Sequence, residues 1–292
     1  MSTHRATVPA RAGLAGNPSD AYGGAAVAVP IPALAATVEV EDAPALSIDG
    51  PADGRRLISA AVARLARHAE VDDEGFMLQW STTIPREVGL AGSSALIIAT
   101  LRALCARWQL TVQPLELAHM ALAVEVEDLG IAAGLMDRAV QAFGVPVLVD
   151  GEAARPLTVV EPPRIIVAWF LAAASSSHGV HGPLRDRYEN DEAAVVTAMA
   201  RLAELGRTAA AALESRDSLA LVTCVRATLA ERVGLGIVGA EVRAMADALE
   251  SVGVAATSAG SGGAVVGVLP PDSSEAGAIA ALERSCDGVV VA

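Results

Sequence analysis

The segment PREVGLAGSSALIIATL, residues 85–101, decides the interpretation of this chain. A turn rich in glycine and alanine is followed by two adjacent serines and then by an apolar run with helical character. At such a junction, unpaired backbone N–H groups and the positive end of a helix face the same space and attract an anion. Gly89 and Gly92 would let a phosphate approach the backbone closely, and Ser94 could offer its hydroxyl to Mg²⁺. The simpler alternative is that Ser93 only caps the helix.

Alternating and helical patterns surround this loop on both sides. In the first half we expect strands and a hairpin around a tight loop within residues 6–40, and further elements after it. These are helices at 55–68, 93–108 and 114–128, and a strand at 76–83. The helix at 93–108 is almost wholly apolar at first, which predicts burial against a sheet.

The second half begins after a proline-rich stretch, residues 155–163, which predicts a domain boundary. We therefore expect two domains, residues 1–155 and 156–292, the second containing a glycine loop at 258–264. The strands of the second half are expected at 164–171, 264–269 and 288–291, and its helices at about 185–203, 205–214, 218–232 and 239–252.

Composition limits the possible functions. The 292 residues are 53% hydrophobic but only 3% aromatic, which suits α/β packing of small aliphatic side chains. A net charge of −13 argues against a nucleic-acid partner. The longest apolar run, residues 165–174, is too short to span a bilayer, and the N-terminus has no signal-peptide core. We expect a cytoplasmic protein that acts on small molecules and is a monomer or homodimer.

Two residue types exclude further classes. The chain has no lysine, because all 21 of its basic residues are arginine. This excludes a P-loop, the strand lysine of protein kinases and a pyridoxal Schiff base. The cysteines, Cys105, Cys224 and Cys286, lack CxxC spacing, so we expect buried thiols and neither disulfides nor a thiolate metal site.

An acidic segment, EVEDLGIAAGLMDRAVQ at residues 125–141, is the second candidate site. Its first acids could be a solvated helix end. Asp137 fits that alternative less well because its neighbours are apolar, and a carboxylate in apolar surroundings requires a partner. Arg11, Arg138 or a metal ion could be that partner, an arrangement typical of a catalytic base.

A third candidate is the glycine loop TSAGSGGAVVGVL, residues 257–269. It is not a G-x-G-x-x-G motif, and it precedes a strand where a Rossmann loop would follow one. It is either a turn that connects strands or a site where a ligand or backbone approaches closely. His178 and His181 could contact a metal, but no third ligand is evident.

In their order along the chain, these loops resemble the motifs of the GHMP kinase superfamily. The segment RAGLAGNPSDAYGG resembles the first motif, R-x-x-L-x-G-x-x-x-D-x-x-G-G, and PREVGLAGSSA resembles the second, P-x-x-x-G-L-x-S-S-A, with one additional residue. Glu125, Gly130 and the GLMD that ends at Asp137 are similar to the galactokinase-like pattern, and SAGSGGA to the third motif. Within the superfamily, GNPSD, GIAAGLMDR and HGVHGPLRDRYENDE look most like the plant-type glucuronokinases.

The resemblance implies an α/β fold in which a ribosomal-protein-like N-terminal domain and a ferredoxin-like C-terminal domain hold ATP and substrate between them. It implies transfer of the γ-phosphoryl group of ATP to a sugar hydroxyl. The similarity to glucuronokinases implies that this acceptor is the anomeric hydroxyl of glucuronate. Asp137 would act as the base and Arg11 would stabilise charge. The resemblance places Mg²⁺ on Ser94 and Glu125, ATP on Gly89, Leu90, Ala91, Gly92, Ser93, Ser94 and Ala95, and substrate near Asp20, Tyr22, Gly23, Arg185, Arg187, Gly260 and Gly262.

Several alternatives stay open. Arg185 and Arg187 would contact the substrate carboxylate or be surface residues at a helix start. The acceptor could also be galactose, arabinose, a heptose phosphate or mevalonate. A nucleotide-binding relative without catalysis, or an interaction protein without a ligand, is the third possibility; the presence of Asp137, Glu125, Arg11 and both serines argues against it.

Overall fold

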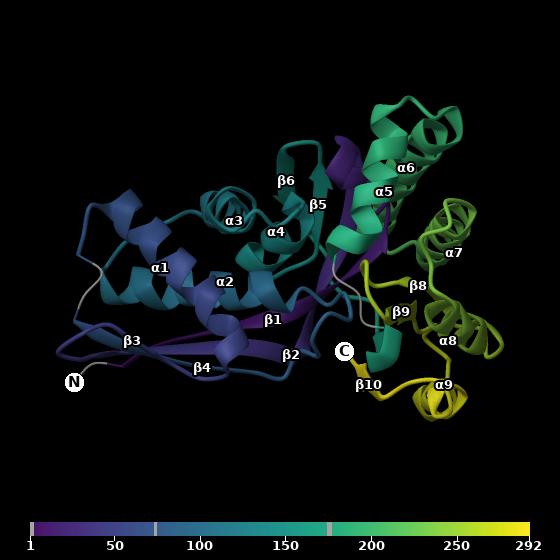
Figure 1. The fold of residues 1–292 in the computed structure, drawn as a ribbon. Coiled ribbons are helices and arrows are strands. Elements are labelled where there is room, and N and C mark those ends of the chain that lie inside the picture. The colour runs from purple at the N-terminus through teal and green to yellow at the C-terminus, as the bar shows by residue number, and fades with distance from the viewer. Residues whose placement is uncertain (1–2, 73–74, 174–176) are drawn as a thin grey trace.

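The computed structural model describes residues 3–72, 75–173 and 177–292. Two β-sheets and their covering helices make a mixed α/β architecture (Figure 1), which confirms the predicted fold class. None of the helices in these ranges is both long and apolar enough to cross a membrane.

The first sheet has the strand order β3-β4-β2-β5-β6, with β1 paired to β2. The long antiparallel hairpin of β1 and β2 dominates it, and β2 pairs with β4 near one end and with β5 near the other. The tight loop of this hairpin contains the short 3₁₀ turn η1 (Ser19–Tyr22). The strands are β1 (Thr3–Ala15), β2 (Ala25–Asp42), β3 (Ser47–Asp49), β4 (Phe76–Thr82), β5 (Val147–Asp150) and β6 (Ala153–Pro156).

Helices α1 (Arg55–Ala69) and α2 (Gly92–Arg107) run along one face of this sheet (Figure 1). The buried positions of α1, Ile58, Ala61, Val62 and Leu65, have the spacing of one helical face. Helix α2 is buried on nearly all sides and packs against β1 and β2, as its apolar sequence predicts. It is followed by α3 (Pro114–Ala123), a π-helical turn η3 (Val124–Asp128) and α4 (Leu135–Phe143).

The second sheet is antiparallel, with the order β10-β7-β9-β8. Helices α7 and α8 pack against it, whereas α6 packs against β2 of the first sheet. The strands are β7 (Ile165–Trp169), β8 (Ala255–Ser258), β9 (Ala264–Val268) and β10 (Gly288–Val291). The helices are α5 (Ser177–Glu189), α6 (Ala193–Ser215), α7 (Ser218–Gly234), α8 (Ala240–Glu250) and α9 (Glu275–Leu282).

The sequence predicted one helix ending at residue 203 and another beginning at 205. This break is wrong, because α6 continues from Ala193 to Ser215. Gly206, beside the expected break, lies where α6 crosses the first sheet. A Cβ atom at Gly206 would lie only 2.4 Å from the Ala25 carbonyl oxygen. The glycine therefore permits close helix–strand contact and does not end the helix. The expected boundary at residue 155 falls within β6, and the division into two domains stays a prediction.

Candidate functional site

A cavity of about 740 Å³ collects side chains from both halves of the chain. This volume lies within the usual range for small-molecule sites. Strand β1, the turns η1 and η3, the helices α2, α4 and α7, and the loop between β8 and β9 all contribute to its lining. The predicted site residues that line it are Arg11, Asp20, Tyr22, Gly89, Leu90, Ala91, Gly92, Ser93, Glu125, Asp137, Arg185 and Gly260.

The loop before α2 has the geometry of an anion site. Gly89 and Ala91 both adopt the left-handed conformation, with φ of +84° and +61°, and α2 then starts at Gly92. None of the described side chains caps this helix, whose N-cap residue is Ala91, so the interpretation of Ser93 as a cap is wrong. The N–H of Ala95 donates to Ala91 O at 3.1 Å. The three N–H groups before it, at residues 92–94, have no intrahelical acceptor.

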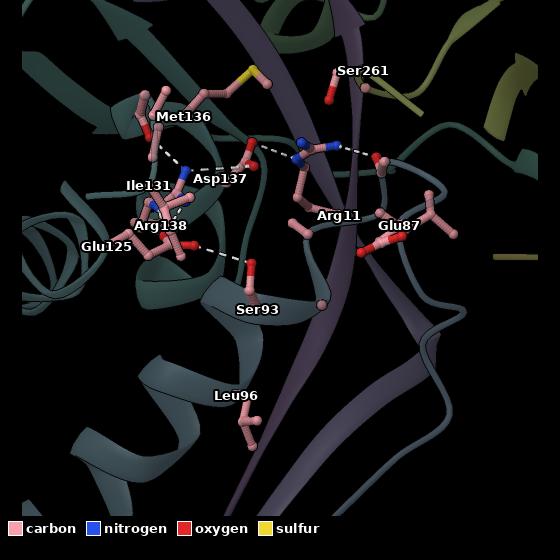
Figure 2. A pocket seen from close by; sticks show the side chains of 18 of the residues that line it. Arg11, Glu87, Ser93, Leu96, Glu125, Ile131, Met136, Asp137, Arg138 and Ser261 are labelled. Atoms are coloured by element: carbon pink, nitrogen blue, oxygen red, sulfur yellow. Dashed lines mark hydrogen bonds and ion pairs between the residues drawn. The ribbon is translucent and has the colours of Figure 1, made fainter. Parts of the chain in front are cut away.

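The two serines have different surroundings. Ser93 Oγ donates to Glu125 Oε1 at 3.0 Å, and both residues line the cavity (Figure 2). Ser94 Oγ instead donates to Ala91 O at 3.2 Å, and Ser94 is buried outside the lining. The structure therefore brings Ser93 to the expected metal ligand Glu125 and does not bring Ser94 there.

The glycine loop between β8 and β9 packs directly on the loop before α2. A Cβ atom at Gly89 would lie 2.6 Å from Gly262 N, and one at Gly260 would lie 2.3 Å from Gly89 O. The segment is thus a strand-connecting turn and also a place of close backbone approach. Glycine is required on both sides because no side chain fits between the two loops.

Arg11 and Asp137 form an ion pair beside these loops (Figure 2). The Arg11 Nε to Asp137 Oδ1 distance is 2.6 Å, and Arg11 Nη1 donates to Gly89 O and Ala259 O, both at 2.8 Å. Asp137 lies in the first turn of α4, with Arg138 Nη1 3.5 Å from its other oxygen. The expected partner of Asp137 is therefore an arginine, and Arg11 holds it in one orientation.

Glu125 and Arg138 form a second, fully buried pair. Arg138 Nε donates to Glu125 Oε2 at 2.6 Å, and Arg138 Nη1 donates to Gly134 O at 2.8 Å. Burial alone lowers the pKa of Arg138, but the charges of Glu125 and Asp137 outweigh it and raise that pKa. The alternative of a solvated helix end is right for Glu127 and Asp128, which pair with Arg64 at the surface, but wrong for Glu125.

Asp20 is a cavity acid with a strongly altered pKa. Its pKa is raised to about 6, first because burial disfavours the charged carboxylate and second because Asp137 is a neighbouring negative charge. Arg11 and Arg138 oppose this shift in the pKa. Asp20 is therefore an acid that changes charge near neutral pH within reach of the Arg11–Asp137 pair.

Arg232, in α7, is a cavity residue that the sequence interpretation missed. It is 2% exposed and lines the cavity, and its guanidinium donates to Asn17 O at 3.2 Å and Gly260 O at 2.7 Å. Burial lowers its pKa to about 10. The helical spacing of Leu221, Val225 and Thr228, which are buried, continues to Arg232 and could have identified it.

Several predicted residues lie elsewhere. Arg187 pairs with Glu192 at 2.7 Å and is not part of the lining, whereas the exposed Arg185 is. Gly23, Ser94, Ala95 and Gly262 are also absent from the lining. The side chains of His178 and His181 lie outside the part of the chain that the structure describes. Among the described residues, no group of three His, Cys, Asp or Glu side chains could hold a metal. Cys105 and Cys224 are buried, as expected, and Cys286 is partly exposed.

Known proteins match this chain in sequence and in fold. Residues 56–145 match the model of the GHMP kinases N terminal domain. Glucuronokinase 1 of Arabidopsis thaliana is 27% identical over 325 residues, which cover 95% of this chain and 87% of that protein.

Two crystal structures show the same fold at low identity. L. major mevalonate kinase in complex with R-mevalonate superposes with a TM-score of 0.83 at 16% identity, covering 100% of this chain and 95% of that chain. Lactococcus lactis galactokinase complexed with galactose gives a TM-score of 0.81 at 16% identity, with coverage of 100% and 92%. The two-sheet α/β fold is therefore the one that the motif resemblance implied.

Proposed function

We propose that this chain is an ATP-dependent small-molecule kinase of the GHMP kinase superfamily and that its acceptor is the anomeric hydroxyl of glucuronate. One observation supports catalysis most strongly. The Arg11–Asp137 pair and the uncapped start of α2 face one cavity, which gives a base and an anion site side by side. The choice of glucuronate is supported by the similarity to Glucuronokinase 1 over nearly the whole chain.

The phosphates of ATP fit the loop before α2. Three N–H groups at residues 92–94 point from an uncapped helix start, and the helix dipole adds positive potential there. Gly89 and Gly92 both line the cavity at this loop. Since the chain has no lysine, backbone N–H groups and Arg11 would provide the protein's share of charge stabilisation.

Magnesium fits the Ser93–Glu125 pair. A hydroxyl and a carboxylate oxygen lie 3.0 Å apart on the cavity wall, and Mg²⁺ is usually held by one or two protein oxygens together with phosphate and water. We therefore propose Ser93, in place of Ser94, as the serine ligand beside Glu125. The bound ion would neutralise charge on the phosphates. Arg138 would hold Glu125 in its orientation.

Asp137 would orient the acceptor hydroxyl and accept its proton as the hydroxyl oxygen bonds to the γ-phosphorus and the bond to ADP breaks. Arg11 fixes the carboxylate through Nε, and its Nη2, which donates to none of the described residues, would bind the transferring phosphoryl oxygens. Asp20, Tyr22 and Gly260 lie on the lining and would contact the sugar, with an ionised Asp20 accepting hydrogen bonds from its hydroxyls.

The direct test measures ADP release from ATP·Mg²⁺ with glucuronate, galactose, arabinose, a heptose phosphate and mevalonate as acceptors. We expect turnover with glucuronate and a ³¹P NMR signal of an anomeric phosphate in the product. The matched control is the Asp137→Asn variant under the same conditions. Turnover with galactose or mevalonate and none with glucuronate would replace the proposed acceptor, and ATP binding without turnover on any of them would argue for a non-catalytic relative.

A further inference from the structure

Three arginines of the cavity are almost fully buried: Arg11, Arg138 and Arg232. The first two are paired, with Asp137 and Glu125 respectively. Within the described ranges, Arg232 forms no ion pair, and its two hydrogen bonds go to backbone carbonyls. A buried guanidinium without a carboxylate is costly, because carbonyl dipoles replace its hydration only in part.

The Arg232 guanidinium also has donor capacity left. Its Nε is buried without a partner, and the two carbonyls take one N–H each from Nη1 and Nη2. Three of its five N–H groups therefore have no acceptor among the residues that the structure describes. This matches the need of a carboxylate, which can accept several hydrogen bonds from one guanidinium.

Arg232 lies between the loop that carries Asp20 and the glycine loop. Its contacts are Asn17 in the loop that carries Asp20, and Gly260 in the glycine loop. Arg11 donates to Ala259 O, so the two guanidiniums bind adjacent carbonyls of that loop. Arg11 is engaged by Asp137, whereas Arg232 has no carboxylate bonded to it among the described residues. The charge of Arg11 and, to a smaller extent, that of Asp20 both act on the pKa of Arg232, so the two guanidiniums form one positive region that favours an anionic group.

We propose that Arg232 binds the anionic group of the acceptor, a carboxylate, and so determines the preference for a sugar acid over a neutral sugar. This inference rests on the proposed function in taking glucuronate as the acceptor. It assigns carboxylate recognition to a buried residue of α7, in place of Arg187, which is held by Glu192 outside the lining, and of Arg185, which lies exposed at the rim of the cavity.

The test compares glucuronate with glucose, which differs in having CH₂OH where the carboxylate stands. We expect Arg232→Gln to lower kcat/KM for glucuronate by roughly 10²-fold, mainly through KM, and to leave kcat/KM for glucose nearly unchanged. Arg232→Lys keeps the charge and should recover part of the loss. Arg185→Gln should have a much smaller effect on glucuronate than Arg232→Gln.

Arg102→Gln is the matched control for loss of a partly buried arginine. Arg102 donates to Ala142 O at 2.8 Å and lies outside the cavity, so its loss should affect the two sugars equally. If Arg232→Gln does not fold, the comparison is made with Arg232→Lys, whose KM should rise for glucuronate and not for glucose. An equal loss on both sugars, an unchanged KM for glucuronate, or a rise confined to the KM for ATP would overturn the inference.

The same experiment separates this inference from the proposed function. If the wild-type protein phosphorylates glucuronate and Arg232→Gln lowers kcat/KM equally for both sugars, the proposed function stands and the proposed role of Arg232 is wrong. If the wild type prefers mevalonate, glucuronate is wrong as the acceptor, and the role of Arg232 is supported if Arg232→Gln raises the KM for that carboxylate and overturned if it does not. A neutral preferred acceptor overturns both.

Discussion

Arg11 Nε lies 2.6 Å from Asp137 Oδ1, although 126 positions separate the two residues in the chain. Strand β1 brings one to the cavity and the first turn of α4 brings the other. The pair places a carboxylate in a fixed orientation beside an uncapped helix start. The following predictions test this arrangement and the groups around it.

Asp137→Asn should lower kcat by roughly 10² or more, because an amide cannot accept the proton of the acceptor hydroxyl. The amide is close in shape to the carboxylate, so the stabilisation of the fold by ATP·Mg²⁺ in a thermal melt should persist. Steady-state turnover with the acceptor that the panel identifies is the measurement. Near-normal kcat would remove Asp137 as the base.

Ser93→Ala should raise the Mg²⁺ concentration needed for half-maximal activity by roughly 10-fold or more, because the hydroxyl beside Glu125 is lost. Ser94→Ala is the matched control, since its hydroxyl bonds to Ala91 O within the same turn. Its Mg²⁺ requirement should stay close to that of the wild type. A larger effect at Ser94 than at Ser93 would assign the metal ligand to Ser94.

Glu125→Gln should lower the free energy of unfolding by about 3–5 kcal/mol, because it removes the carboxylate bonded to the buried Arg138 and leaves it only the more distant charge of Asp137. Glu127→Gln is the control from the same π-helical turn. The Glu127 side chain is 65% exposed and pairs with Arg64, so its loss should cost under about 1 kcal/mol. Urea denaturation measures both, and equal effects would contradict the buried pair.

The pKa of Asp20, raised to about 6, predicts that kcat/KM for the acceptor falls as pH decreases below this value. A protonated Asp20 loses the charge that accepts hydrogen bonds from sugar hydroxyls. In Asp20→Asn, kcat/KM should be low and this limb of the pH profile absent. An unchanged limb in the variant would assign it to another group.

The same shift predicts the effect of Asp20 on stability. A carboxyl whose folded pKa exceeds its unfolded value of 3.8 binds its proton more tightly in the fold, so its ionisation opposes folding as pH rises through about 6. Asp20→Asn should therefore be more stable than the wild type at pH 8, by about 1–3 kcal/mol, and this difference should vanish below pH 3.8. Denaturant melts at several pH values measure it.

Gly89→Ala should impair both stability and ATP binding, because the new Cβ would lie 2.6 Å from Gly262 N and the residue has φ of +84°. Gly144→Ala separates the two causes. Gly144 has φ of +72°, but nothing lies within 4 Å of a Cβ there, so only the backbone strain of about 1–2 kcal/mol applies. A thermal melt and the KM for ATP should both change more at Gly89, and equal changes would argue against the close contact of the two loops.

Much of the fold could be predicted from the sequence, because the spacing of apolar residues within a short segment determines which face of a helix is buried. The helical spacing in α1 correctly predicted one buried face, and the apolar run in α2 correctly predicted burial on nearly all sides. The continuity of α6 was not predictable in this way. Whether a glycine ends a helix or lets it pass a strand depends on Ala25, which is distant in sequence.

The residues of the candidate site likewise divide into those that local sequence predicted and those that depend on distant contacts. The apolar neighbours of Asp137 indicated a partner, and Arg11 was among the expected ones. The choice between Ser93 and Ser94 depends on which way the first turn of α2 faces Glu125, and sequence spacing does not specify this rotation. Arg232 was only the last residue of the helix expected at about 218–232, and its packing against residues 17 and 260 makes it a buried cation.

The bond from Arg11 to the Ala259 carbonyl spans 248 positions, and it has a consequence for biosynthesis. A growing polypeptide carries Gly89, Glu125 and Asp137 long before the ribosome adds the segment with Ala259. Until that segment arrives, the arginine that orients Asp137 lacks one of its two carbonyl acceptors. Completion of the site is thereby tied to late translation, and a prematurely terminated product would hold the aspartate without the full clamp on its partner.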